Sequence, residues 1–308
     1  MRRPPTALLA LVLPPAFLWQ SAPQGNLEVT HVRYGVDNLQ IRGLVCAPRT
    51  FRPGRPLLML EHGGFSSEPS LELCRRFAEQ GYVVAQSAYR GQGGSQGQVE
   101  ACMGEVRDSR ALQRLVQDRY LTSKVGFLGV SLGGCVALKA AAGQSGVGAV
   151  VTLISPTDFA EQVGILQRTR PDAVNRWHQI FGGSPQDNPQ AYAQRSPLAA
   201  AARVKAPLMV VAADQDPLIP VSQSCRVRDV RRKAGFRVLE VRLNRQGEPY
   251  RGELKAWRRC AGERPLGQLP PLRGEDVLLH YGDLFHTSTP QMWNAAEQFL
   301  AAYLQPRR

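Results

Sequence analysis

The chain has 308 residues, and 43% of them are hydrophobic, which is enough for the sizeable core of a globular domain. Its 38 lysines and arginines outnumber its 25 aspartates and glutamates, giving a formal net charge of +13. Because no recognisable nucleic-acid-binding motif accompanies this charge, we expect no nucleic-acid partner. Length alone would allow two domains, and the sequence does not define an oligomeric state.

The N-terminal segment has the pattern of a secretory signal. Met1-Arg2-Arg3 supplies a positive start, residues 6–19 are mostly apolar, and Ser21-Ala22 offers a cleavage site. The apolar stretch is too short and too interrupted by proline to span a membrane. We therefore predict a signal peptide over residues 1–22, a secreted or periplasmic location, and a single domain over residues 23–308. A buried N-terminal helix is the alternative.

Strands and helices alternate along the rest of the chain, which predicts an α/β fold with a mostly parallel, doubly wound sheet. The predicted strands cover residues 28–34, 39–47, 57–60, 83–87, 125–128, 149–154, 207–212 and either 236–243 or 277–281. The predicted helices include residues 71–80, 105–117 and 291–304. Residues 159–204 lack strand character and are predicted to form a small helical cap. Within it, Trp177, Ile180 and Phe181 are candidates either for lining a pocket or for the core.

The sequence Gly129-Val130-Ser131-Leu132-Gly133 lies between a predicted strand and a helix of small residues. A G-x-S-x-G pattern at such a turn is typical of a nucleophile elbow, which lifts the serine hydroxyl above the sheet edge. The two glycines are needed because a Cβ at either position would collide with neighbouring backbone. Ser131 is therefore the predicted nucleophile.

A second G-x-S-x-G match covers residues 93–97 and centres on Ser95. No apolar strand runs directly into it, and Gln98-Val99-Glu100 is a poor start for a packed helix. We interpret this segment as a flexible loop and keep Ser95 as the alternative nucleophile.

Candidates for an acid and a base follow in the second half of the chain. Asp216 lies in an Asp-Pro-x-x-Pro turn after the predicted strand 207–212, at the sheet edge where ligands gather in open α/β sheets; Asp214 is the alternative. His286 lies in a loop before the last helix and is the predicted general base. The other histidines lie in predicted strands, in a helix or before a Gly-Gly pair: His31, His62, His178 and His280. The order serine, aspartate, histidine along the chain supports Ser131, Asp216 and His286.

These residue types suit acyl transfer. The histidine accepts the serine proton and returns it to the leaving group, while the aspartate fixes the histidine tautomer. The oxyanion that develops needs N–H donors. We predict one from Leu132, directly after the nucleophile, and the other from Gly64 or Phe65 in the loop that follows strand 57–60.

Four stretches together resemble α/β-hydrolases of the prolyl-oligopeptidase and dienelactone-hydrolase grouping. They are His62-Gly63-Gly64, residues 89–95 (YRGQGGS), residues 129–134 (GVSLGG) and residues 181–198. The similarity runs from about residue 57 to residue 223 and resumes at the C-terminus. The resemblance implies the α/β-hydrolase fold and a Ser-Asp-His acyl-transfer enzyme, with no metal or organic cofactor.

The chain also departs from this grouping. Only about 55 residues precede the first hydrolase-core strand, too few for the propeller that such peptidases carry. The acid and the base are 70 residues apart (286 − 216), and the excess lies in an insertion over residues 244–275 that is rich in Gly, Pro and Arg. Phe285-His286 also stands where the grouping often has Gly-His.

Six cysteines in an exported protein suggest disulfides. We expect Cys225–Cys260 first and Cys74–Cys102 second, with Cys135 buried as a small hydrophobic residue. No two cysteines have the close spacing of a zinc site, so none is expected.

The sequence thus predicts a secreted serine hydrolase that cleaves ester or amide bonds, with a small ester or a short peptide as substrate. The absent propeller favours an esterase or a small-acyl hydrolase. The alternative is a non-catalytic α/β-hydrolase relative whose site is blocked by the insertion and which binds an anionic partner through its arginines.

Overall fold

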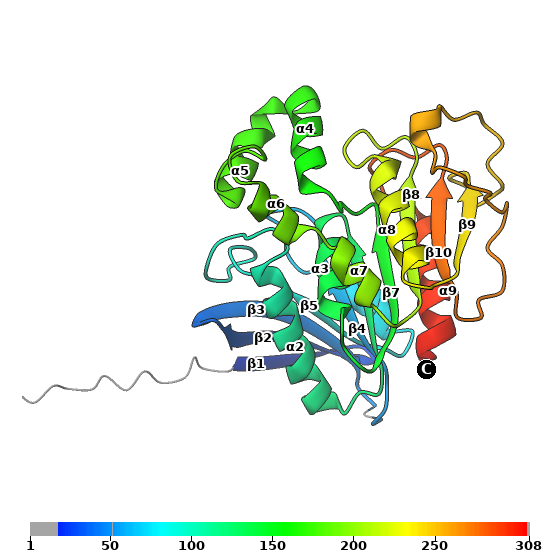
Figure 1. The fold of residues 1–308 in the computed structure, drawn as a ribbon. Coiled ribbons are helices and arrows are strands. Elements are labelled where there is room, and N and C mark those ends of the chain that lie inside the picture. The colour runs from blue at the N-terminus through cyan, green and yellow to red at the C-terminus, as the bar shows by residue number, and fades with distance from the viewer. Residues whose placement is uncertain (1–17, 51, 307–308) are drawn as a thin grey trace, which may run out of the picture.

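One sheet of ten strands organises the computed structural model, which describes residues 18–50 and 52–306 (Figure 1). In spatial order its strands are β1 (Leu18–Gln24), β2 (Leu27–Val36), β3 (Leu39–Pro48), β5 (Val83–Ser87), β4 (Leu57–Glu61), β6 (Val125–Val130), β7 (Val147–Leu153), β8 (Leu208–Ala213), β10 (Asp276–Tyr281) and β9 (Val238–Leu243). The pairs β1–β2, β2–β3 and β3–β5 are antiparallel, and all later pairs in this order, from β5 to β9, are parallel. Strands β4, β5, β8 and β10 are buried at every residue, which explains their unbroken apolar runs.

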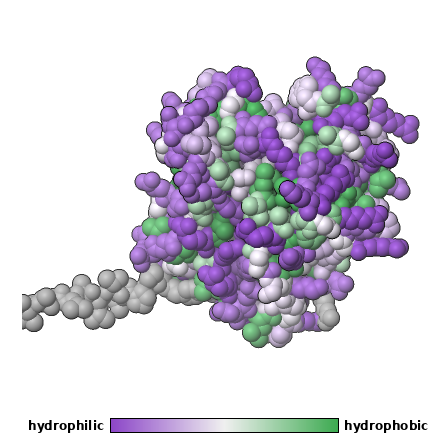
Figure 2. Space-filling model, in the orientation of Figure 1, coloured by the Kyte–Doolittle hydropathy of each residue, from purple (hydrophilic) through white to green (hydrophobic). Residues whose placement is uncertain are grey.

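Helices cover both faces of the sheet, so the predicted α/β-hydrolase arrangement is confirmed. One face packs against α2 (Gly104–Tyr120), α3 (Leu132–Ala141) and α8 (Val221–Lys233). The other packs against α1 (Leu71–Ala78) and α9 (Pro290–Leu304). Both alternatives for the late strand, 236–243 and 277–281, form strands, β9 and β10. Hydrophilic side chains cover much of the visible surface (Figure 2).

The predicted cap is helical. It consists of α4 (Phe159–Thr169), α5 (Pro171–Phe181), α6 (Pro189–Arg195) and α7 (Leu198–Arg203), and α4 and α5 project beyond the sheet (Figure 1). Trp177 packs against Phe159 and Phe181, with ring centroids 5.8 and 5.6 Å apart, and Phe181 also packs against Tyr192. This aromatic cluster gives the cap a small core of its own.

The segment between β9 and β10 occupies the predicted insertion, residues 244–275, beside the end of the sheet (Figure 1). It contains one short 3-10 helix, η1 (Ala256–Arg258), and two isolated bridges to β9. The disulfide Cys225–Cys260 joins it to α8, as predicted. It is therefore anchored to the sheet edge and to a neighbouring helix.

The prediction of Cys74–Cys102 is wrong, because these two cysteines lie on opposite faces of the sheet. Cys74 on α1 pairs with Cys46 on β3, and Cys102 pairs with Cys135 at the start of α3. Cys135 is buried as expected, but in a disulfide.

Most of the predicted signal peptide, residues 1–17, lies outside the described residues. Its last five residues, 18–22, belong to β1 and pair with β2. Within residues 18–50 and 52–306, no helix combines the length and the apolar character needed to cross a membrane.

Candidate active site

Ser131 lies at the sharp turn between β6 and α3. Its φ of 51° is positive, a conformation that a residue with a side chain rarely adopts and that the surrounding packing must enforce. A Cβ on Gly129 would collide with the backbone of Gly133, and a Cβ on Gly133 would collide with the backbone of Glu61. The elbow glycines therefore allow the close packing that the sequence pattern predicts.

His286 lies between Ser131 and Asp216. Its Nε2 is 3.5 Å from the Ser131 Oγ, and its Nδ1 is 2.7 Å from the Asp216 Oδ2. The longer distance is compatible with a hydrogen bond that tightens when substrate binds. With Nδ1 donating to the carboxylate, Nε2 is free to accept the serine proton.

The acid is held by its own turn. Asp216 Oδ1 accepts N–H bonds from Leu218 at 2.8 Å and Ile219 at 2.9 Å, and its side chain is 1% exposed. The N–H of Gln215 donates to the carbonyl of Leu284 at 2.9 Å. Since β8 and β10 are adjacent and parallel, the acid turn and the histidine loop leave the sheet at the same edge.

The two sequence alternatives have other roles. Ser95 Oγ accepts the N–H of Arg42 on β3 at 2.9 Å, so this hydroxyl ties the loop to the sheet. Asp214 Oδ1 is 2.8 Å from His280 Nδ1, and both side chains are fully buried. Asp214 thus pairs with a different histidine from Asp216.

The predicted oxyanion loop runs directly beside the nucleophile. A Cβ on Gly63 would be 2.8 Å from the Val130 carbonyl oxygen and 2.9 Å from the Ser131 Cβ. Gly64 has a φ of +78°, which favours glycine. Gly64 and Phe65 line the same cavity as Ser131, Leu132 and His286, so both candidate donor segments border the cavity next to Ser131.

A cavity of about 490 Å³ opens beside Ser131. Its apolar wall includes Phe65, Leu166, Ala173, Trp177, Leu218 and Ile219. Arg170, Asp172 and Arg176 from the cap also line it. Trp177 therefore faces the pocket, whereas Phe181 is buried within the cap cluster. The cap arginines carry no sequence signal, because their position depends on how the cap folds back.

A buried acid, Glu61, lies at the end of β4, directly before the predicted oxyanion loop. Burial raises the pKa of Glu61 to about 7, although hydrogen bonds from Ser109 and Tyr89 favour its ionised form. Burial also lowers the pKa of the adjacent His62, whose ring lies 4.3 Å from that of Tyr89. Neither residue lines the cavity beside Ser131.

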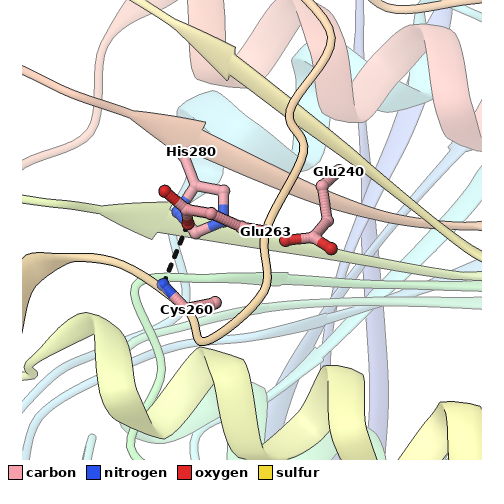
Figure 3. A group of neighbouring side chains, drawn as sticks. All are labelled: Glu240, Cys260, Glu263 and His280. Carbon is pink, nitrogen blue, oxygen red and sulfur yellow. Dashed lines mark hydrogen bonds between the residues drawn. The ribbon is translucent and has the colours of Figure 1, made fainter. Parts of the chain in front are cut away.

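Glu240, Cys260, Glu263 and His280 form a second cluster of potential ligand atoms, between β9, β10 and the insertion (Figure 3). Cys260 is consumed in a disulfide. Both carboxylates are paired with arginines: Glu240 with Arg228 and Arg232, and Glu263 with Arg242 and Arg259. This donor set does not suit a metal ion, because four guanidinium groups already neutralise the carboxylates.

Known proteins match this chain over most of its length. The profile of the prolyl oligopeptidase family matches residues 71–247, more than half of the chain. The "Uncharacterized peptidase YtmA" of Bacillus subtilis (strain 168) is 24% identical over 208 residues, which cover 66% of this chain and 79% of that protein.

Two solved structures show the same fold. Acetyl xylan esterase 1 from Thermoanaerobacterium sp. JW/SL YS485 has a TM-score of 0.68 at 16% identity, covering 96% of this chain and 89% of that one. Pyrococcus horikoshii acylaminoacyl peptidase has a TM-score of 0.67 at 15% identity, covering 94% of this chain. This chain spans only 42% of that peptidase chain.

Proposed function

Because the chain belongs to the prolyl oligopeptidase family and is a serine hydrolase of the esterase or peptidase type, we propose that Ser131, His286 and Asp216 form its catalytic triad. The observation that carries this proposal is the continuous contact from the Ser131 Oγ through the His286 ring to the Asp216 carboxylate.

The reaction proceeds through an acyl-enzyme. The Ser131 Oγ attacks the substrate carbonyl while the His286 Nε2 takes its proton, and Asp216 stabilises the resulting imidazolium. The oxyanion accepts N–H bonds from Leu132 and from Gly64 or Phe65. His286 then protonates the leaving group, and a water molecule, activated by the same histidine, releases the acyl group.

The size of the cavity favours a small substrate. A volume of about 490 Å³ with an apolar wall of cap residues suits a short acyl group or a short peptide. Relatives of the same fold include an acetyl xylan esterase and an acylaminoacyl peptidase, so both bond types occur on this scaffold. We favour an ester of a small acyl group, with short peptides as the second substrate class.

We also propose a secreted or periplasmic location. The three disulfides support an oxidising compartment, and the basic and apolar N-terminal sequence supports export.

The alternative of a blocked, non-catalytic binding protein has less support. No described residue of the insertion 244–275 lines the cavity beside Ser131. The arginines that would bind an anionic partner are in part internal: Arg231 is 1% exposed and pairs with Asp276 at 2.7 Å.

A fluorophosphonate probe tests the assignment of the nucleophile. In the native protein we expect a covalent adduct on Ser131, located by peptide mass spectrometry. Ser131→Ala should lose the adduct and about 10⁴-fold or more of its ester turnover, because no hydroxyl remains to form the acyl-enzyme. Ser95→Ala is the matched control and should label and turn over like the native protein. An adduct on Ser95, or full turnover by Ser131→Ala, would refute the proposal.

A further inference from the structure

Two adjacent residues of α5 hold one residue of the predicted oxyanion loop. Arg176 Nη2 donates a hydrogen bond to the carbonyl oxygen of Phe65 at 2.8 Å, and its guanidinium lies 5.6 Å from the centre of the Phe65 ring. Trp177 meets the same ring edge to face, with centroids 5.0 Å apart. The cap thus contacts both the backbone and the side chain of Phe65.

The loop has little other backbone support at this point. The β4 ladder ends at Glu61, paired with Gly129. Among the described residues, no hydrogen bond between backbone groups reaches Gly64, Phe65 or Ser66. Farther along the loop, the N–H of Ser67 donates to the Gln92 side chain at 3.1 Å. The Phe65 carbonyl therefore depends on a side chain of the cap to fix its peptide plane.

We propose that Arg176 is a positioning residue that holds the oxyanion loop against Ser131 from the cap. The inference rests on the proposed function, since it assumes that Gly64 or Phe65 donates to the oxyanion. An oxyanion donor works only when it lies within hydrogen-bond distance of the developing charge, so a small displacement of this loop weakens the transition state more than the substrate complex. The planar, permanently charged guanidinium can bond the carbonyl and lie over the ring at once, which a lysine cannot do.

This contact also links substrate binding to catalysis. Ala173 and Trp177 of α5 line the cavity that would receive the acyl group. A substrate that packs against Ala173 and Trp177 therefore contacts the same helix, α5, that holds Phe65. Substrates that fill the cap side of the cavity should gain in kcat as well as in binding.

Kinetics of Arg176→Ala and Arg176→Lys on p-nitrophenyl acetate test the role of this residue. We expect Arg176→Ala to lower kcat about 10- to 100-fold with KM changed less than about 3-fold, because misplacement by about 1 Å has an effect of this size. Affinity for a trifluoromethyl ketone, which forms a tetrahedral adduct on the serine, should fall in parallel with kcat/KM. Arg176→Lys should recover part of both losses, since its ammonium can still donate to the carbonyl.

Arg168→Gln is the matched control. Arg168 is an exposed arginine at the end of α4 that does not line the cavity, so kcat and ketone affinity should stay at the native values. All variants should keep the native Tm, because Arg176 is also exposed.

Two outcomes would overturn the positioning role. One is a native kcat and ketone affinity in Arg176→Ala; the other is a raised KM with unchanged kcat, which would make Arg176 a substrate contact. Either result, with fluorophosphonate still labelling Ser131, would leave the proposed function intact. A native protein that neither labels at Ser131 nor hydrolyses the ester would refute both.

Discussion

Two aspartate–histidine pairs lie close together at the adjacent strands β8 and β10: an inner pair, Asp214 and His280, and an outer pair, Asp216 and His286. Of the two, the outer pair is next to Ser131, the proposed nucleophile. Asp214 and His280 are 2.8 Å apart with both side chains fully buried. Asp216 and His286 are 2.7 Å apart, but the His286 side chain is 23% exposed and its free nitrogen faces Ser131. Asp214 and Asp216 are only two residues apart, but their histidine partners differ in exposure to solvent.

The inner pair belongs to a charge network with the insertion. Arg242 Nε donates to Asp214 at 2.8 Å, and both of its terminal nitrogens donate to Glu263. The His280 Nε2 is buried without a hydrogen-bond partner among the described residues. No described arginine or lysine pairs with the acid of the outer pair; backbone N–H groups of the acid turn donate to it instead. Contact with a serine hydroxyl, and not the aspartate–histidine contact itself, therefore separates the candidate triad from the structural pair.

The largest expected effect comes from breaking the outer pair. Asp216→Asn should lower kcat for a p-nitrophenyl ester by about 10⁴-fold, because an amide can hold the wrong tautomer and cannot stabilise the imidazolium. The overall fold should survive, since the asparagine side-chain oxygen can still accept the N–H groups of Leu218 and Ile219. Circular dichroism and steady-state kinetics on the same preparation measure both.

Asp214→Asn is the matched change in the inner pair. It should leave kcat within a few-fold of the native value but lower the free energy of unfolding by about 3 kcal/mol, because Arg242 loses a buried charged partner. Urea titration gives the stability, and kinetics on the folded protein gives the rate. Loss of turnover in Asp214→Asn together with an active Asp216→Asn would show that Asp214, and not Asp216, is the catalytic acid.

The elbow and the acid turn were predictable from local signals, and His286 from its position after them in the chain. An apolar strand followed by G-x-S-x-G and small residues indicates an elbow at Ser131, and the prolines after Asp216 indicate its turn. The Asp214–His280 pair was not predictable, since both pairs form through the adjacency of β8 and β10, but only Ser131, Asp216 and His286 follow a known order of catalytic residues along the chain. In the same way, Cys46 and Cys74 could not be paired without knowing which sheet face each cysteine occupies.

An effect of similar size on stability is expected at the disulfide Cys225–Cys260, which anchors the insertion beside the inner pair. Cys225 and Cys260 are 35 residues apart, so replacing both with serine should lower the free energy of unfolding by about 3 kcal/mol through added freedom of the unfolded chain. The kcat should change little, because no described insertion residue lines the cavity. Urea titration and ester kinetics test both expectations. A large loss of kcat at unchanged stability would show that the insertion acts on the outer pair.

The smallest expected effect is a dependence of the free energy of unfolding on pH, caused by Glu263, which shares Arg242 with the inner pair. Burial by itself would raise the pKa of Glu263, but hydrogen bonds from Arg242 and Arg259 lower it from its ordinary value of 4.5 to about 2. A carboxylate whose pKa is lower in the folded state stabilises the fold above its ordinary pKa and loses that contribution as the pH falls. The native free energy of unfolding should therefore decline between about pH 4.5 and pH 2.

Glu263→Gln isolates this contribution. The variant should be less stable than the native protein at pH 7 and should decline less steeply over the acid range, because it has no carboxylate to protonate at this position. Urea unfolding at successive pH values measures both slopes. Equal slopes would show that Glu263 does not carry the acid sensitivity. Since no described residue of the insertion lines the cavity, kcat of Glu263→Gln at pH 7 should stay near the native value. The network around the inner pair can then be changed without changing the outer pair.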